Sequence, residues 1–225
     1  MRIRRIFAEL IGTTILALGI CLKNGSATAM GASLWTAIIG TGFISGASFN
    51  PAITTAVLIV GIFKNKLSRW DIFEHITYYF AHFIGAMLGA CLAWAMKGET
   101  WALAIPTTSS EGQAYLAETC GTTMLILVAM VGGELRDSAF IGTLAVSSTL
   151  YLAGLNLAAI SGACVNPAIG VGANFADAVN HGYEGVKHLW IYICAPLTGS
   201  VVAAIFYLII KPELDKIYQQ KEETK

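Results

Sequence analysis

The stretch SGASFNPAI at residues 45–53 returns later in the chain as SGACVNPAI at residues 161–169. The two copies differ only at their fourth and fifth positions, and they lie 116 residues apart (161 minus 45). A second pair of stretches, AELIGTT at 8–14 and AETCGTT at 117–123, repeats in the same order. The chain is therefore a duplicated unit, and each copy of the unit carries one Asn-Pro-Ala motif.

The composition is that of a membrane protein. Hydrophobic residues make up 56% of the 225 residues and charged residues only 12%, whereas soluble domains carry about 25% charged residues. The charges are clustered, and the apolar runs between them approach the ~20 residues that a helix needs to cross a bilayer. We expect six spans, at Ile6–Leu22, Met30–Ile44, Ile76–Met96, Ala114–Gly132, Ser138–Ala158 and Leu189–Ile210.

The basic residues predict the orientation of these spans. With six crossings both termini lie on one side, and that side holds most of the cations: Arg2, Arg4, Arg5, Lys64, Lys66, Arg69, Arg136, Lys211, Lys216, Lys221 and Lys225. The other side receives Lys23, Lys97 and Lys187. Because positive charge is retained on the cytoplasmic side, we expect both termini there, with residues 211–225 as a cytoplasmic tail.

Several other classes of segment and site are disfavoured. The N-terminal apolar run resembles a signal peptide, but it carries Glu9, whose counterpart Glu118 lies in mid-chain, so we expect a retained first span. A net charge of zero gives no reason to expect nucleic acid as a partner. The five cysteines show no metal-ligand spacing, and we expect no metal, no cofactor and no disulfide.

Each Asn-Pro-Ala motif reads as the start of a short helix. Asn is a favoured N-cap and Pro is tolerated at the first helical position, so Asn50 caps a helix that runs to about Gly61, and Asn166 caps one that runs to about Ala176. These helices are too apolar for solvent and too short to span. They should dip into the membrane and return, which is tolerated only where they are buried in protein or line water.

A unit with three full spans must insert its second copy upside down. The prediction is thus an all-α membrane protein of six transmembrane helices plus two re-entrant half-helices in an inverted repeat, a pattern found in channels and transporters. We expect one channel domain over residues 1–225, with repeats at 6–97 and 114–210.

The two half-helices then meet N-terminus to N-terminus in mid-membrane. Each brings the positive end of a helix dipole, on the order of half a charge, so the meeting point repels cations, including hydrated protons. The side-chain amides of Asn50 and Asn166 would both donate to one water oxygen there. Such a water donates outward to both neighbours and does not relay a proton in one direction.

The paired motifs, the repeated Ala-Glu-x-x-Gly-Thr and the PLTG at 196–199 together resemble the aquaporin, or major intrinsic protein, family over essentially the whole chain. The pore motifs are then Asn50-Pro51-Ala52 and Asn166-Pro167-Ala168. The resemblance implies the aquaporin hourglass fold, a homotetramer with one pore per subunit, and water or small neutral solutes as cargo.

The resemblance also gives roles to buried polar residues. Carboxylates inside a membrane are costly and therefore candidates for function, and the family implies that Glu9 and Glu118 hold the re-entrant loops. His82 matches a position in the third span that usually carries Gln. We expect a hydrogen-bonded interior histidine there rather than a gate.

The outer constriction departs from the family. Its arginine, which follows the second Asn-Pro-Ala, is replaced by Ile169, and the chain has no arginine after Arg136. Counting from the motifs, the selectivity filter falls at Met30, Gly154, Ala163 and Ile169, a set that is apolar and wider than a strict water filter. The acidic residue of glycerol facilitators corresponds to Gly170. The lost arginine and the phrase GASFNP are similar to the small basic intrinsic proteins.

Passive conduction of water and small neutral solutes is the function that these features favour. The altered filter leaves open an alternative, a non-conducting protein of the same fold with a structural role in a membrane assembly. An ion-coupled transporter would need further titratable groups near the midplane. No nucleophile–base pair or metal constellation is apparent in the sequence, so we do not expect an enzyme.

Overall fold

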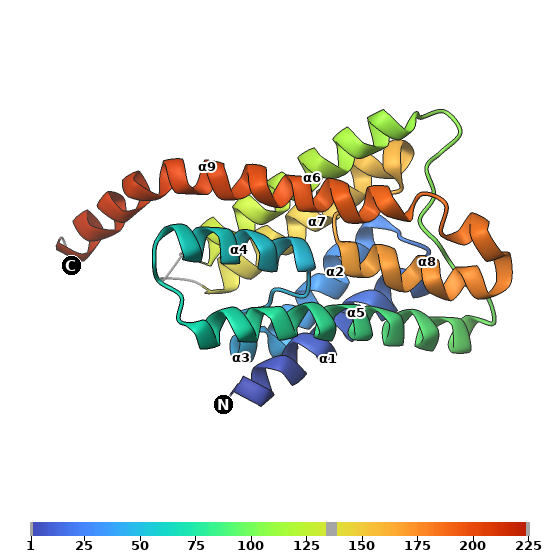
Figure 1. The fold of residues 1–225 in the computed structure, drawn as a ribbon, viewed down its shortest axis with the longest axis horizontal. Helices are drawn as coiled ribbons and strands as arrows, with labels where there is room; N and C mark the ends of the chain where they lie inside the picture. Colours follow the sequence, from blue (N-terminus) through green and yellow to red (C-terminus); the bar gives the residue numbers. More distant parts are fainter. Residues whose placement is uncertain (1, 134–138, 224–225) are drawn as a thin grey trace.

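The protein is described by a computed structural model that covers residues 2–133 and 139–223. Within these ranges all regular structure is helical, with no strand. Six segments are long and apolar enough to cross a membrane: Arg2–Leu22, Ala27–Ser45, Arg69–Lys97, Glu111–Gly132, Ala139–Ser161 and Leu189–Ile217. They form a bundle in which both ends of the chain lie at the same end (Figure 1). The six predicted spans are confirmed.

Two spans extend beyond their predicted bounds. Helix α5 (Arg69–Lys97) begins at Arg69 rather than Ile76, because Ser68 and Asp71 form a capping box that starts the helix within the basic loop. Helix α9 (Leu189–Glu223) continues past Ile210 in spite of Pro196 and Pro212. Helices α1 (Arg2–Leu22), α6 (Glu111–Gly132) and α7 (Ala139–Ser161) lie close to the predicted bounds. The predicted start of the fifth span at Ser138, together with Arg136 and Lys225, lies outside the described residues.

The second span is irregular at the end that leads into the first motif. It begins as α2 (Ala27–Ala37), capped by Ser26, and continues through a π-helical segment, η1 (Ile38–Gly42), into the short α3 (Phe43–Ser45). π-helical segments inside helices are rare and occur often at functional sites.

Helices α4 (Pro51–Phe63) and α8 (Pro167–His181) are the two half-helices, and both outlast their predicted ends. At 1.5 Å per residue they are about 20 Å and 22 Å long, still short of the ~30 Å hydrocarbon core. Figure 1 shows them entering from opposite ends of the bundle with their first turns at its centre. A 3₁₀ turn, η2 (Gly182–Gly185), follows α8.

The two halves pack in the same way. Helix α1 runs along α5 in the first half, and α6 runs along α9 in the second. A methyl group on Gly85 would come within 2.6 Å of the carbonyl oxygen of Leu10, and one on Gly199 within 2.7 Å of that of Thr119. Glycine is needed at both positions because the helix backbones approach this closely. The structure is therefore an inverted repeat in its packing as well as in its sequence.

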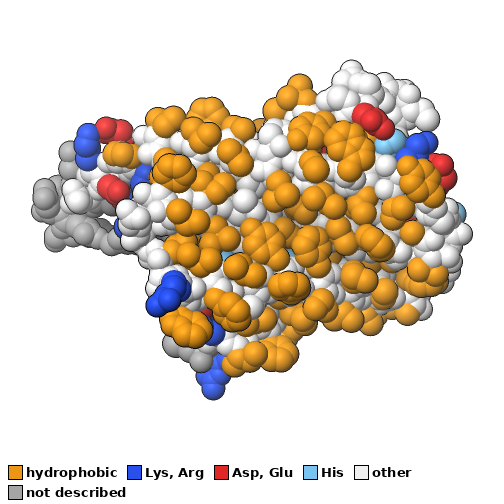
Figure 2. All heavy atoms as spheres, viewed as in Figure 1, with side chains coloured by type: hydrophobic (Ala, Val, Ile, Leu, Met, Phe, Trp, Pro, Cys, Tyr) orange, Lys and Arg blue, Asp and Glu red, His pale blue; other side chains and the backbone are white. Residues whose placement is uncertain are grey.

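The outer surface matches a bilayer environment. Figure 2 shows a broad apolar surface over the middle of the molecule, with charged side chains gathered at its two ends. Large apolar side chains such as Phe80, Leu116 and Ile209 are more than 60% exposed. A soluble monomer does not expose so continuous an apolar surface, so lipid is the environment for which this surface is suited.

Candidate functional site

The loops that lead into the half-helices have the same strained backbone. In the first loop Ala47 and Phe49 have φ of 57° and 47°, and in the second Ala163 and Val165 have φ of 58° and 45°. Residues other than glycine rarely adopt this left-handed region, least of all a β-branched one. Each such residue costs about 1–3 kcal/mol, so surrounding contacts must hold the loops in place.

A buried carboxylate holds the first loop. Glu9 is fully buried, and it accepts hydrogen bonds from the backbone N–H groups of Ser48 at 3.1 Å and Phe49 at 2.7 Å. Its Oε2 atom also lies 2.7 Å from Nε2 of His82. This set of partners satisfies both carboxylate oxygens in the apolar interior, which a buried charge requires.

Glu118 has the equivalent place in the second half. It accepts hydrogen bonds from the N–H groups of Cys164 at 2.8 Å and Val165 at 2.6 Å, and from the hydroxyl of Ser161 at 2.6 Å. The donors match those at Glu9, where Ser45 holds the position of Ser161 and also hydrogen-bonds the carboxylate, and His82 is an additional partner of Glu9. His82 itself is buried, and its Nδ1 atom has no partner among the described residues.

The two motifs meet at the centre of the molecule. The side-chain oxygen of Asn50 accepts from the N–H of Ala52 at 2.8 Å, and that of Asn166 accepts from Ala168 at 3.0 Å, so each asparagine caps its own half-helix. The amide nitrogen of Asn50 donates to the carbonyl of Val165 at 2.9 Å, and that of Asn166 donates to the carbonyl of Phe49 at 3.0 Å.

These reciprocal bonds leave fewer free N–H donors on the two asparagines than the sequence predicts. A side-chain amide has two N–H groups, and one from each asparagine is used to bind the opposite loop. Each asparagine therefore keeps one N–H for which the structure shows no acceptor among the described residues. The strained φ values of Phe49 and Val165 belong to the residues whose carbonyls receive these bonds.

A small cavity lies beside the asparagines. Asn50, Asn166, Ser48 and Cys164 supply its polar lining, and Ile169 lies on its wall. Its volume of about 10 Å³ holds roughly one water molecule. Most of the remaining lining is aliphatic, so the asparagine amides are the principal donors that face the space.

The predicted filter residues are all buried. Met30, Ala163 and Ile169 belong to one core cluster, with exposures of 1%, 4% and 3%. A methyl group on Gly154 would lie 2.8 Å from the sulfur of Met30, so the methionine occupies the space that this glycine leaves. Of the four residues, Ile169 lines the central cavity, whereas Met30, Gly154 and Ala163 do not.

The sequence of this chain matches a known protein family. The family model described as "Major intrinsic protein" matches residues 2–207. The chain belongs to the major intrinsic protein family. The family is one of membrane channels, with members named as aquaporins and as glycerol uptake facilitators.

Individual relatives come from both kinds of member. The chain is 31% identical to a glycerol uptake facilitator protein-like 6 of Lactiplantibacillus plantarum, over 89% of this chain and 95% of that protein. It is 32% identical to aquaporin NIP1-1 of Zea mays, over 93% and 75%. The X-ray structure of the aquaglyceroporin from Plasmodium falciparum has the same fold, with a TM-score of 0.77, 22% identity, and coverage of 96% and 99%.

Sequence reasoning missed several features of this major intrinsic protein. It did not anticipate that Phe49 and Val165 supply the carbonyls that join the two loops, nor that Cys164 lines the central cavity. It also assigned nothing to Ile53, which lines the same cavity. A signal for Ile53 was present, because isoleucine follows the motif in both copies of the repeat.

Proposed function

We propose that the protein is a passive channel for water and small neutral solutes. The observation that carries the proposal is the pair of asparagines at the centre of the bundle, each capping a half-helix, bonded to the opposite loop and left with one free donor. A passing water would accept from these fixed donors, which replace part of its lost hydration.

Exclusion of protons at the same point is part of the proposal. Helices α4 and α8 direct their N-terminal ends at the centre (Figure 1), and each end carries on the order of half a positive charge. A cation that arrives there meets both dipole ends, whereas a neutral molecule does not. A water that accepts from Asn50 and Asn166 points its own hydrogens away from the centre, which interrupts proton relay.

The supporting roles follow from the contacts. We propose that Glu9 and Glu118 hold the re-entrant loops, since each accepts two backbone N–H bonds from the loop that precedes a motif. We propose that Met30, Gly154, Ala163 and Ile169 form the outer constriction. None of these four side chains is charged or donates a hydrogen bond, so selection there would rest on size and dehydration.

A second candidate is a weakly conducting or closed protein with a structural role. The burial of Met30 and Ile169 and the small central volume favour it, because a constriction this tight and apolar resists wetting. The retained donors of Asn50 and Asn166 favour conduction. Flux measurements separate the two candidates.

Assembly and orientation are further proposals. Family resemblance supports a homotetramer with one pore per subunit. The basic loop between α4 and α5 lies at the same end of the bundle as both termini, which supports a cytoplasmic location for that end. Native mass in detergent tests the tetramer, and protease access to a terminal tag in sealed vesicles tests the orientation.

The function is tested by osmotic shrinkage of proteoliposomes in a stopped-flow instrument. We expect a water permeability above that of empty vesicles, with a low activation energy that reflects a pore. A permeability equal to that of empty vesicles, with circular dichroism showing folded helical protein, would contradict conduction and support the structural role.

A further inference from the structure

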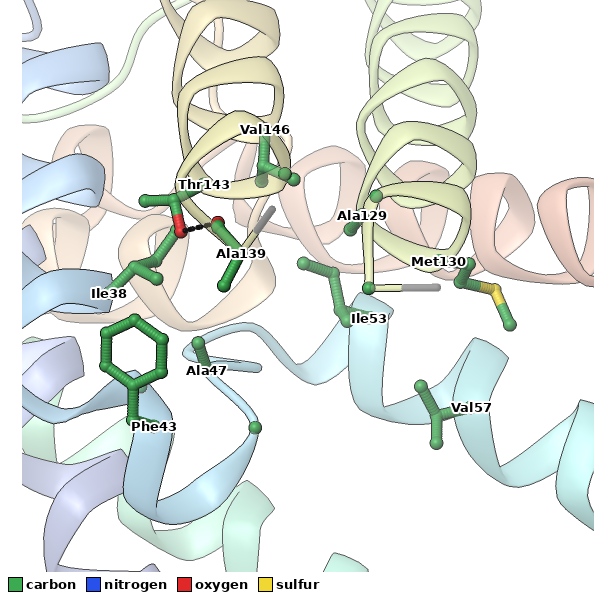
Figure 3. A pocket seen from close by; sticks show the side chains of 15 residues that line it. Ile38, Phe43, Ala47, Ile53, Val57, Ala129, Met130, Ala139, Thr143 and Val146 are labelled. Carbon is green, nitrogen blue, oxygen red and sulfur yellow. Dashed lines mark hydrogen bonds between the residues drawn. The ribbon is translucent and has the colours of Figure 1, made fainter. Parts of the chain in front are cut away.

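Two hollows in the structure share one side chain. The central cavity beside the asparagines is lined by Ile53 as well as by Ile169. A larger hollow of about 370 Å³ opens near α3 and the end of α6, and Ile53 lines it too. Figure 3 shows Ile53 pointing from the start of α4 into this larger hollow, among apolar residues of α6 and α7. Ile53 therefore lies between the larger hollow and the central cavity.

Ile169 has the matching place on the other side of the asparagines. It follows the second motif as Ile53 follows the first, and the two half-helices enter from opposite ends (Figure 1). Both isoleucines are buried, at 8% for Ile53 and 3% for Ile169. Ile169 also belongs to the predicted outer set, in which Met30 rests against Gly154.

The wall between the isoleucines is mostly aliphatic. Its members come from α1, α2, α6 and α7: Leu16, Ile20, Leu34, Leu125 and Leu150. Polar contact is supplied by the two asparagines and by Ser48 and Cys164. The Ser48 hydroxyl and the Cys164 thiol are themselves turned to the carbonyls of Asn50 and Asn166, at 3.2 Å and 3.0 Å.

We propose that Ile53 and Ile169 are two apolar constrictions in series that enclose the asparagine chamber and set the class of cargo. Narrow apolar rings empty of water more readily than polar ones, and a solute must leave hydration behind at each ring. The channel therefore prefers small neutral solutes with few hydrogen-bonding groups over polyols of similar size. The inference rests on the proposed function, since it assumes a conducting pore.

The preference can be measured with two solutes that differ by one hydroxyl group. Propane-1,2-diol and glycerol share a three-carbon skeleton, and their entry into proteoliposomes is followed by reswelling after osmotic shock. After subtraction of the flux into empty vesicles, we expect the wild-type protein to pass the diol faster than glycerol. A glycerol flux equal to or above the diol flux would overturn the assigned cargo class.

The serial arrangement is tested by Ile53→Ser, Ile169→Ser and the double variant. When two similar barriers lie in series, removal of either one raises glycerol flux by at most about two-fold, and removal of both raises it by more than the product of the single effects. Ile62→Ser is the matched control, because Ile62 lies on the same helix as Ile53 and is 55% exposed. It should leave flux unchanged.

Three outcomes separate this inference from the proposed function. If wild-type protein conducts water and either single variant already reaches the flux of the double, there is one constriction and the inference fails alone. If wild-type protein is silent but the double variant conducts, the two constrictions in series stand, whereas the assigned cargo class and conduction by the wild-type protein fail. If every folded variant is silent, both fail. If a serine variant misfolds, Ile53→Val and Ile169→Val replace it, because each removes only one methyl group. We expect their glycerol fluxes to follow the same order with smaller increases.

Discussion

Glu118 shows how one buried side chain fixes the geometry of the second loop. A glutamine in its place turns one acceptor oxygen into an amide nitrogen that faces the N–H of Cys164 or Val165. We expect Glu118→Gln to destabilise the protein by about 1–3 kcal/mol, the usual result of an unsatisfied buried group, and to lower water permeability. Thermal unfolding and osmotic flux measure the two effects.

The control for Glu118→Gln is Glu99→Gln, because the side chain of Glu99 is 67% exposed and pairs only with Lys97 in the described contacts. It should leave both measurements unchanged, as exposed ion pairs contribute little. Equal loss of stability in the two variants would contradict the role assigned to Glu118.

Substitutions of His82 separate the effect of its hydrogen bond to Glu9 from the effect of its packing near the first loop. Its Nε2 atom lies 2.7 Å from Glu9, and the ring is fully buried. His82→Gln keeps a donor for Glu9 and much of the volume, whereas His82→Ala leaves a cavity and a carboxylate with one partner fewer. We expect unfolding midpoints in the order wild type, His82→Gln, His82→Ala, with water flux following the same order. An alanine variant as stable as wild type would show that the Glu9 contact is dispensable.

The two loops are strained segments, and glycines at matching positions let them turn. Gly46 and Gly162 have φ of 102° and 86°. A Cβ on Gly46 meets nothing within 4 Å, whereas one on Gly162 lies 2.9 Å from the carbonyl oxygen of Ala104. We expect Gly46→Ala to cost about 1–2 kcal/mol from backbone strain alone, and Gly162→Ala to cost more, as measured by chemical or thermal unfolding.

Gly40→Ala is the companion control for the glycine pair. Gly40 has no left-handed φ, and a Cβ there also meets open space, so this variant should not destabilise the protein. An equal effect of alanine at Gly46 and Gly162 would indicate that the Ala104 contact relaxes freely.

The architecture of the whole molecule was largely predictable, and the reason is the repeat. The number of spans follows from the lengths of the apolar runs, and the starts of the half-helices follow from the two Asn-Pro pairs. Both are local signals, and together they imply that the second repeat is inverted. The contacts between the halves were not predictable, because the Asn50 to Val165 bond joins residues 115 positions apart. The π-helical segment at Ile38–Gly42 also left no clear signal, since its residues suit an ordinary helix.

The filter shows the same division between pattern and geometry. Counting from the motifs, as the family resemblance implies, placed Met30, Gly154, Ala163 and Ile169 in one predicted filter. In the structure Met30, Ala163 and Ile169 belong to one core cluster, and Met30 packs against Gly154. How tightly Met30 closes against Gly154 depends on side-chain packing, which a count of positions does not give. Because Met30 fits closely against Gly154, a closed protein with a structural role is a second candidate beside a conducting channel.

The central claim is that this chain conducts water and rejects protons at the asparagine pair. The most direct measurement records both fluxes in the same proteoliposomes: osmotic shrinkage for water, and an enclosed pH-sensitive dye under an imposed potential for protons. The account predicts water permeability above that of empty vesicles with proton flux no higher than theirs. Proton flux that rises together with water flux would contradict it.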